Sequence, residues 1–118
     1  MNAVRTTRTL LTIVIAFVAL MAMSPPIAAQ GDPKKGEQVY TAQKCSVCHS
    51  IAGKGNTKGA LDAVGTKLSA AEIREWIVDP AGMTAKSKAA RKPAMPAKYG
   101  SVPKADLDAL VAYLASLK

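Results

Sequence analysis

The feature that most constrains this chain is the pentapeptide CSVCH at residues 45–49, which holds both cysteines and the only histidine of the 118-residue sequence. A structural zinc site normally uses four Cys or His ligands, often in two such halves, and the sequence has no second half. A redox-active dithiol would lie between a strand and a helix, whereas the flanking residues predict a helix and a Gly/Lys-rich loop. A local disulfide between Cys45 and Cys48, or a zinc knuckle, remains as an alternative.

The spacing C-x-x-C-H is typical of a c-type haem attachment site. In such a site two thiols form thioethers to the vinyl groups of the haem, and the adjacent histidine ligates the iron. The three residues must be adjacent because one macrocycle binds all of them. The sequence therefore predicts one covalently bound haem c, attached through Cys45 and Cys48, with His49 as an iron ligand.

The N-terminal residues predict an export signal. Residues 1–9 contain Arg5 and Arg8 and no acidic residue, and residues 10–23 form an apolar run followed by SPPIAAQGD. A basic region, an apolar region and a small-residue region in this order are typical of a secretory signal. The apolar run is shorter than the roughly 20 residues that a transmembrane helix needs.

Cleavage after Ala28 or Ala29 is therefore favoured, which predicts a signal peptide over residues 1–29 and one exported domain over residues 30–118. The expected localisation is periplasmic. Ile27 lies where the cleavage rule prefers a small residue, so an uncleaved membrane anchor is the alternative.

The chain is basic, with a formal net charge of +8, and loss of residues 1–29 would leave 14 basic against 8 acidic residues, or +6. A basic charge can indicate binding to nucleic acid or to a membrane surface. The export signal and the lack of a basic cluster with interleaved aromatic residues speak against nucleic acid. We expect protein partners with an acidic docking surface instead, and no stable membrane insertion once the signal is cleaved.

Residues 33–44 are predicted to form the first helix of the exported domain, because Asp32 can cap it and Pro33 suits its first position. The following residues, 50–67, contain four glycines and three lysines without a lasting period. This composition predicts a long loop.

A capping box formed by Ser69 and Glu72 predicts a short helix, which Asp79 and Pro80 should end. Glycines and prolines then interrupt residues 81–100. We expect these residues to form a loop that wraps over another part of the molecule.

The chain is predicted to end in an amphipathic helix over residues 102–117, with Ser101 as its N-cap. No segment of the exported part alternates between apolar and polar residues as a strand would. The predicted fold class is therefore all-α.

In this order, a helix that ends in CxxCH, a Gly-rich loop, a short helix that ends in Asp-Pro, a Met-Pro loop and an amphipathic last helix resemble a class I c-type cytochrome over residues 31–118. The resemblance implies the cytochrome c fold, in which the N- and C-terminal helices cross while a short middle helix and loops wrap around one covalent haem. It also implies that Gly36 and Tyr40 pack across Leu110 and Tyr113.

The resemblance further implies that Trp76 lies beside the haem. Where the family usually has Gly-Pro, this chain has Gly59 and Ala60, and we expect the carbonyl of Ala60 to bond to the second ring nitrogen of His49. The connection before the methionine is longer than in the best-known mitochondrial members and includes KSKAARK, residues 86–92. This insertion is expected to form an exposed basic excursion.

Iron needs a sixth ligand, and the exported part offers Met83 and Met95 but no second histidine. Met83 follows Asp-Pro too soon to cross the haem face easily. Met95 stands between prolines in PAMP, and in the family the ligand methionine commonly precedes a proline. We therefore expect His49 and Met95 to ligate the iron, with Met83 as the alternative.

An iron with both axial positions filled has no vacancy for oxygen or peroxide, which predicts an electron carrier between respiratory or other redox partners and not an enzyme. The alternatives are a haem subunit of a larger complex and a small-molecule-binding haem protein with a displaceable sixth ligand. The cations expected to face a partner flank the haem motif and the methionine loop: Lys44, Lys54, Lys86, Lys88, Arg91, Lys92 and Lys98.

Overall fold

The structure is a computed structural model that describes residues 31–118. In chain order its elements are α2 (Pro33–Ala42), the 3₁₀ turn η3 (Cys45–Val47), β1 (Ser50–Ile51), β2 (Lys54–Gly55), η4 (Thr57–Gly59), α3 (Val64–Lys67), α4 (Ala70–Val78), α5 (Pro80–Ser87), η5 (Ala97–Ser101) and α6 (Lys104–Ser116). The predicted signal peptide, residues 1–29, lies outside the described residues. Among residues 31–118, no helix is long and apolar enough to cross a membrane.

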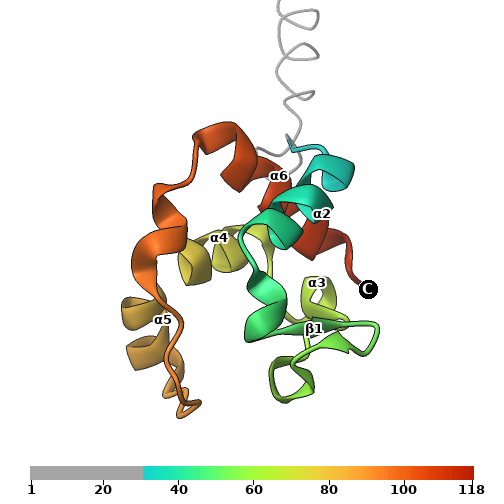
Figure 1. The fold of residues 1–118 in the computed structure, drawn as a ribbon. Helices are drawn as coiled ribbons and strands as arrows, with labels where there is room; N and C mark the ends of the chain where they lie inside the picture. The colour runs from blue at the N-terminus through green and yellow to red at the C-terminus, as the bar shows by residue number, and fades with distance from the viewer. Residues whose placement is uncertain (1–30) are drawn as a thin grey trace, which may run out of the picture.

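The first and last described helices, α2 and α6, cross at one end of the molecule (Figure 1). Gly36 lies at the crossing, where an added Cβ would overlap the backbone of Ala109 and the Cβ of Tyr113. One turn further along α2, the ring of Tyr40 meets that of Tyr113 edge on, with centroids 6.1 Å apart and an interplanar angle of 65°. The predicted packing of the Gly36 and Tyr40 face against the last helix is therefore confirmed.

Helix α2 begins where the sequence predicts. The side chain of Asp32 accepts a hydrogen bond from the backbone N–H of Lys34 at 2.9 Å, and Pro33 occupies the first turn. The helix ends at Ala42, two residues earlier than predicted, because Lys44 adopts a left-handed conformation with φ of 55°. This turn leads the chain directly into the CxxCH motif.

Helix α6 begins at Lys104, two residues later than predicted, and Ser101 does not cap it. The reason is Pro103, whose ring disfavours helical geometry at the preceding residue. Val102 is accordingly extended, with ψ of 154°. Ser101 instead belongs to the separate turn η5.

The predicted capping box of α4 is present. The Ser69 hydroxyl accepts from the Glu72 backbone N–H at 3.2 Å, and the Ser69 backbone N–H donates to the Glu72 carboxylate at 2.8 Å. The helix ends before Asp79, as predicted, and buries Ile73 and Ile77. Through these two side chains, one face of α4 packs against α6 and the core.

The residues after α4 differ from the prediction of a continuous loop, because Pro80–Ser87 forms the helix α5. Pro80 ends α4 but also occupies the first turn of the next helix, where a missing N–H costs nothing. The Asp79 side chain caps α5 by accepting from the Gly82 N–H at 3.0 Å. Only the segment after Lys88, which has φ of 54°, runs without a helix toward Met95.

Residues 50–67 are also more ordered than the predicted loop. Strands β1 and β2 form a two-stranded antiparallel hairpin in which Ser50 pairs with Gly55. Gly53 and Gly55 adopt positive φ values of 75° and 108°, which glycine permits without strain. The strands are too short to show an alternating pattern in the sequence.

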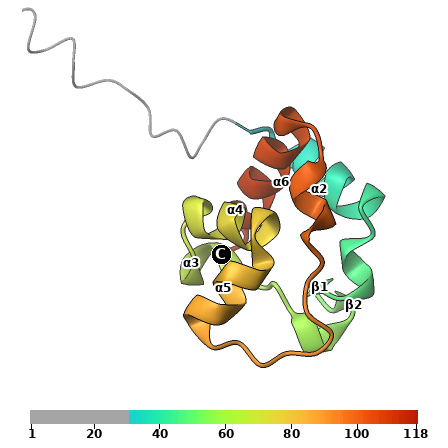
Figure 2. The ribbon, with the colours of Figure 1, turned by 90° about the vertical axis from the view of Figure 1, so that its left-hand side faces the viewer.

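The hydrophobic core lies between α2, α4 and α6. Its buried members are Val39, Tyr40, Ile73, Ile77, Leu107, Leu110, Val111 and Leu114. Figure 2 shows a mostly helical molecule with the short hairpin of β1 and β2 at its edge, and the all-α class is confirmed. In Figure 1 the hairpin with η3 lies on one side below α4, and α5 with the segment leading to η5 lies on the other.

Candidate haem site

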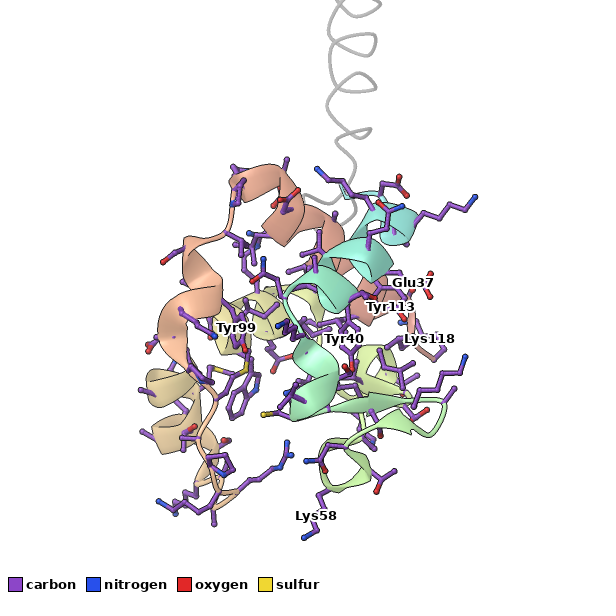
Figure 3. All side chains as sticks on the ribbon, viewed as in Figure 1. Glu37, Tyr40, Lys58, Tyr99, Tyr113 and Lys118 are labelled. Atoms are coloured by element: carbon purple, nitrogen blue, oxygen red, sulfur yellow. The ribbon has the colours of Figure 1, made fainter. Side chains whose placement is uncertain are left out.

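A largely apolar cavity of about 320 Å³ lies among these elements. Helices α2, α4 and α6 contribute apolar and aromatic side chains to its lining, among them Tyr40, Ile73, Trp76, Ile77, Leu110 and Leu114. Tyr40 of α2 and Tyr99 of η5, both labelled in Figure 3, line the cavity from two separate parts of the chain. Such a cavity can hold a flat apolar cofactor.

Both cysteines and the histidine line this cavity. The turn η3 brings them together: the backbone N–H groups of Cys48 and His49 both donate to the carbonyl of Cys45, at 3.1 and 2.9 Å. Each of the three side chains is half-buried, and both thiols are free. Burial raises the pKa of the Cys45 thiol. The geometry presents two thiols and one imidazole to the same cavity.

The second ring nitrogen of His49 corrects one expectation. His49 Nδ1 lies 2.9 Å from the carbonyl oxygen of Gly59 and does not bond to Ala60. Gly59 ends the turn η4, whereas Ala60 is taken up in a parallel bridge with Ser50. The hydrogen bond is therefore made one residue earlier in the chain than expected.

Burial lowers the pKa of His49, an effect that the Gly59 carbonyl opposes and the nearby positive charge of Arg91 reinforces. The imidazole is therefore neutral at neutral pH. With Nδ1–H donating to Gly59, its Nε2 keeps a lone pair available to a metal.

The two candidate methionines occupy different environments. Met95 lines the cavity together with its neighbours Ala94 and Pro96. Met83 lies in α5, is half-buried, and is not among the residues that line the cavity. Met95 therefore lines the cavity and Met83 does not, while the choice of ligand stays a prediction.

Two aromatic residues of the lining fit a bound haem. Trp76, which the resemblance places beside the haem, lines the cavity. The hydroxyl of Tyr40 is buried and has no hydrogen-bond partner within residues 31–118. Since buried hydroxyls in native proteins nearly always have a partner, this one leaves room for a polar contact from a bound group or a water beside it.

An apolar cavity lined by the two thiols and the imidazole of a CxxCH motif defines a c-type haem protein. A family model described as cytochrome c matches residues 33–118, and the chain belongs to the cytochrome c family. It accordingly binds haem c covalently and is a haem-binding electron-carrier cytochrome, since the family generally carries electrons. A search of curated proteins and a search of solved structures gave no significant match.

From the sequence, Arg91 was expected to lie in an exposed basic excursion and to be one of the cations that face a partner. Arg91 is indeed exposed, but it also lines the cavity and its guanidinium donates to the backbone carbonyl of Cys48. The contact joins residues 43 apart in the sequence, so no local pattern could have indicated it.

Proposed function

We propose that this protein is an exported monohaem cytochrome that carries single electrons between respiratory or other redox partners, with His49 and Met95 as the residues that would ligate the haem iron. The observation that supports this is that one apolar cavity is lined by both thiols of the CxxCH motif, its histidine, and Met95. Haem c, when bound, supplies a one-electron centre.

The proposed role of His49 is to offer Nε2 to the iron. Its Nδ1, 2.9 Å from the Gly59 carbonyl, holds the ring in one orientation and makes Nε2 a better donor. The proposed roles of Cys45 and Cys48 are the two thioether bonds. Because all three side chains come from one short turn, attachment and ligation would reinforce each other.

The proposed role of Met95 is to supply a second ligand that would hold the iron. Pro93 and Pro96 restrict the backbone on either side of it, so little conformational freedom is lost when it binds. A thioether ligand raises the reduction potential relative to a second histidine. An iron with both positions occupied would exchange electrons without binding a substrate.

Exposed positive charges near the cavity support docking to an acidic redox partner. Of the predicted cations, Lys86 forms an exposed ion pair with Glu75 at 3.5 Å, and Lys98 lies over the Tyr99 ring, 5.1 Å from its centroid. Lys88 and Lys92 form no ion pair within residues 31–118 and are exposed. They are the cations we expect to steer a partner toward the haem.

Export rests on the sequence of residues 1–29, and the proposed location is the periplasm. If the signal is cleaved, the protein diffuses; if residues 10–23 are retained, it is membrane-anchored. Fractionation of the expressed protein, with N-terminal sequencing of the purified form, distinguishes these two outcomes.

Extraction of the purified protein with acid acetone tests the central proposal, because thioether-bound haem stays with the polypeptide. The ferric protein should show the deep-red absorption band of a methionine–iron bond, and redox titration should follow a one-electron curve. Free extraction of the haem would contradict the attachment. Rapid binding of carbon monoxide to the ferrous protein would instead favour a small-molecule-binding haem protein.

A further inference from the structure

Arg91 connects two parts of the haem site that are distant in sequence. Its guanidinium Nη2 donates a hydrogen bond to the backbone carbonyl of Cys48, which closes the turn η3 of the attachment motif. Arg91 itself lies on the segment 88–96, which runs from the end of α5 through Met95. Both residues line the cavity, so the hydrogen bond bridges two of its walls.

Gly59 provides the space for this bridge. A Cβ at Gly59 would overlap the Arg91 guanidinium and the Cys48 carbonyl at once. The carbonyl of the same glycine bonds to His49 Nδ1. The guanidinium therefore packs against the residue that orients the proposed axial histidine.

The neighbouring cations do not share this arrangement. Lys92, the next residue, and Lys88 make no hydrogen bond or ion pair through their side chains within residues 31–118. Lys86 pairs with Glu75, which lies on the adjacent helix α4 and not on the attachment motif. A guanidinium, with several donors in a rigid plane, suits a carbonyl bridge better than an ammonium group does.

We propose that Arg91 is a positioning residue that ties the segment 88–96 to the CxxCH motif and thereby keeps Met95 on the iron. The proposal rests on the His49 and Met95 ligation proposed above. Exchange of the methionine for an external ligand requires that the segment moves away from the cavity. The bond between Arg91 and Cys48 must then break, so its loss should make opening more frequent while leaving the closed site intact.

The test compares the ferric holoprotein with two variants, Arg91→Gln and Lys92→Gln. Each variant removes one positive charge at adjacent, exposed positions, but only the first removes the bridge. The rate at which imidazole displaces the methionine is followed through loss of the deep-red band. Amide hydrogen exchange of residues 88–96, measured by mass spectrometry, reports opening independently of the iron.

Arg91→Gln should accelerate displacement about tenfold, which corresponds to about 1.4 kcal/mol and is typical of a partly exposed charge-assisted hydrogen bond. Exchange of the segment should accelerate in parallel. Lys92→Gln should stay within about twofold of the wild type, as a surface substitution without partners does. Arg91→Lys, which keeps the charge and loses the planar fork, should fall between the two.

Equal rates in the wild type and Arg91→Gln would overturn the proposal. So would equal acceleration in Arg91→Gln and Lys92→Gln, because the effect would then depend on charge and not on the bridge. If either outcome is found while the wild type shows the deep-red band, the positioning role of Arg91 is wrong and the proposed function still stands. A wild type that lacks the band and binds imidazole at once would overturn both the ligation and the tie.

Discussion

Gly36 of α2 lies so close to the carbonyl group of Ala109 in α6 that a Cβ on the glycine would overlap it. The atoms that this Cβ would meet are the Ala109 carbonyl group and the Cβ of Tyr113, which cannot rotate out of the way. Gly36→Ala should therefore force the two helices apart and lower the free energy of unfolding by about 1–3 kcal/mol. Urea denaturation of the holoprotein, followed by circular dichroism, measures the change.

Gln38→Ala is the matched control for this substitution, because Gln38 lies exposed on the same helix. It should change stability by no more than about 0.5 kcal/mol. An equally small effect of Gly36→Ala would mean that the helix crossing is looser than the structure describes.

Replacement of Met95 by alanine should open one axial position. The ferric protein should lose its methionine–iron band, the reduction potential should fall, and the ferrous protein should bind carbon monoxide without competition. Met83→Ala serves as the control and should leave all three properties unchanged, because Met83 is not part of the cavity lining. The opposite pattern in the two variants would identify Met83 as the ligand.

Because Tyr40 is buried, the free energy of unfolding should fall at alkaline pH. The residue is 7% exposed, and burial raises the pKa of its hydroxyl to about 12. A group whose folded pKa exceeds its unfolded value contributes stability that is fully present below the unfolded pKa, about 10, and is lost as the pH rises through the folded one. Between these two values the wild type should lose stability more steeply than Tyr40→Phe.

Urea denaturation of both proteins at a series of pH values from neutral to strongly alkaline checks this difference. Groups distant from Tyr40 contribute equally to both curves and cancel in the comparison, whereas Tyr113, which meets the Tyr40 ring, adds to the difference. Parallel curves would show that the Tyr40 hydroxyl is more accessible to water in the haem-loaded protein than in the structure.

Charge reversal of Lys88 and Lys92 to glutamate should slow association with the redox partner. The wild-type association rate should also fall as salt is added, because exposed charges farther apart than about 8 Å are screened at physiological ionic strength. Stopped-flow electron transfer at several salt concentrations measures both effects, and redox titration should find the potential nearly unchanged. A rate that responds neither to salt nor to the reversals would indicate apolar recognition around the haem edge.

Several features of the fold could be predicted because their causes are local. The caps at Asp32 and at Ser69 with Glu72 depend on side chains that bond to backbone groups two or three residues away. The helix crossing could be expected from Gly36 and Tyr40 because a resemblance supplied the partner helix. The predicted start of the last helix and the predicted loop in place of α5 were wrong for the same local reason. A proline interrupts one helix but also permits another to begin.

The haem site divides in the same way. Cys45, Cys48 and His49 could be recognised without a structure, because one macrocycle requires them within five residues of each other. The hydrogen-bond partner of His49 could not be recognised in the sequence, because every residue has the same backbone carbonyl. Only the turn η4 and the bridge between Ser50 and Ala60 select the carbonyl of Gly59.

The cofactor, its attachment motif and the all-α class could therefore be predicted without a structure, since they depend on residue types at short, fixed spacing. Three other features depend on how the chain folds: Met95 and not Met83 lines the cavity, Gly59 meets His49, and Arg91 reaches Cys48. Contacts such as the last, between residues 43 apart, form because chain folding brings distant backbone groups within reach of a long side chain. No local pattern of residues encodes such a distance.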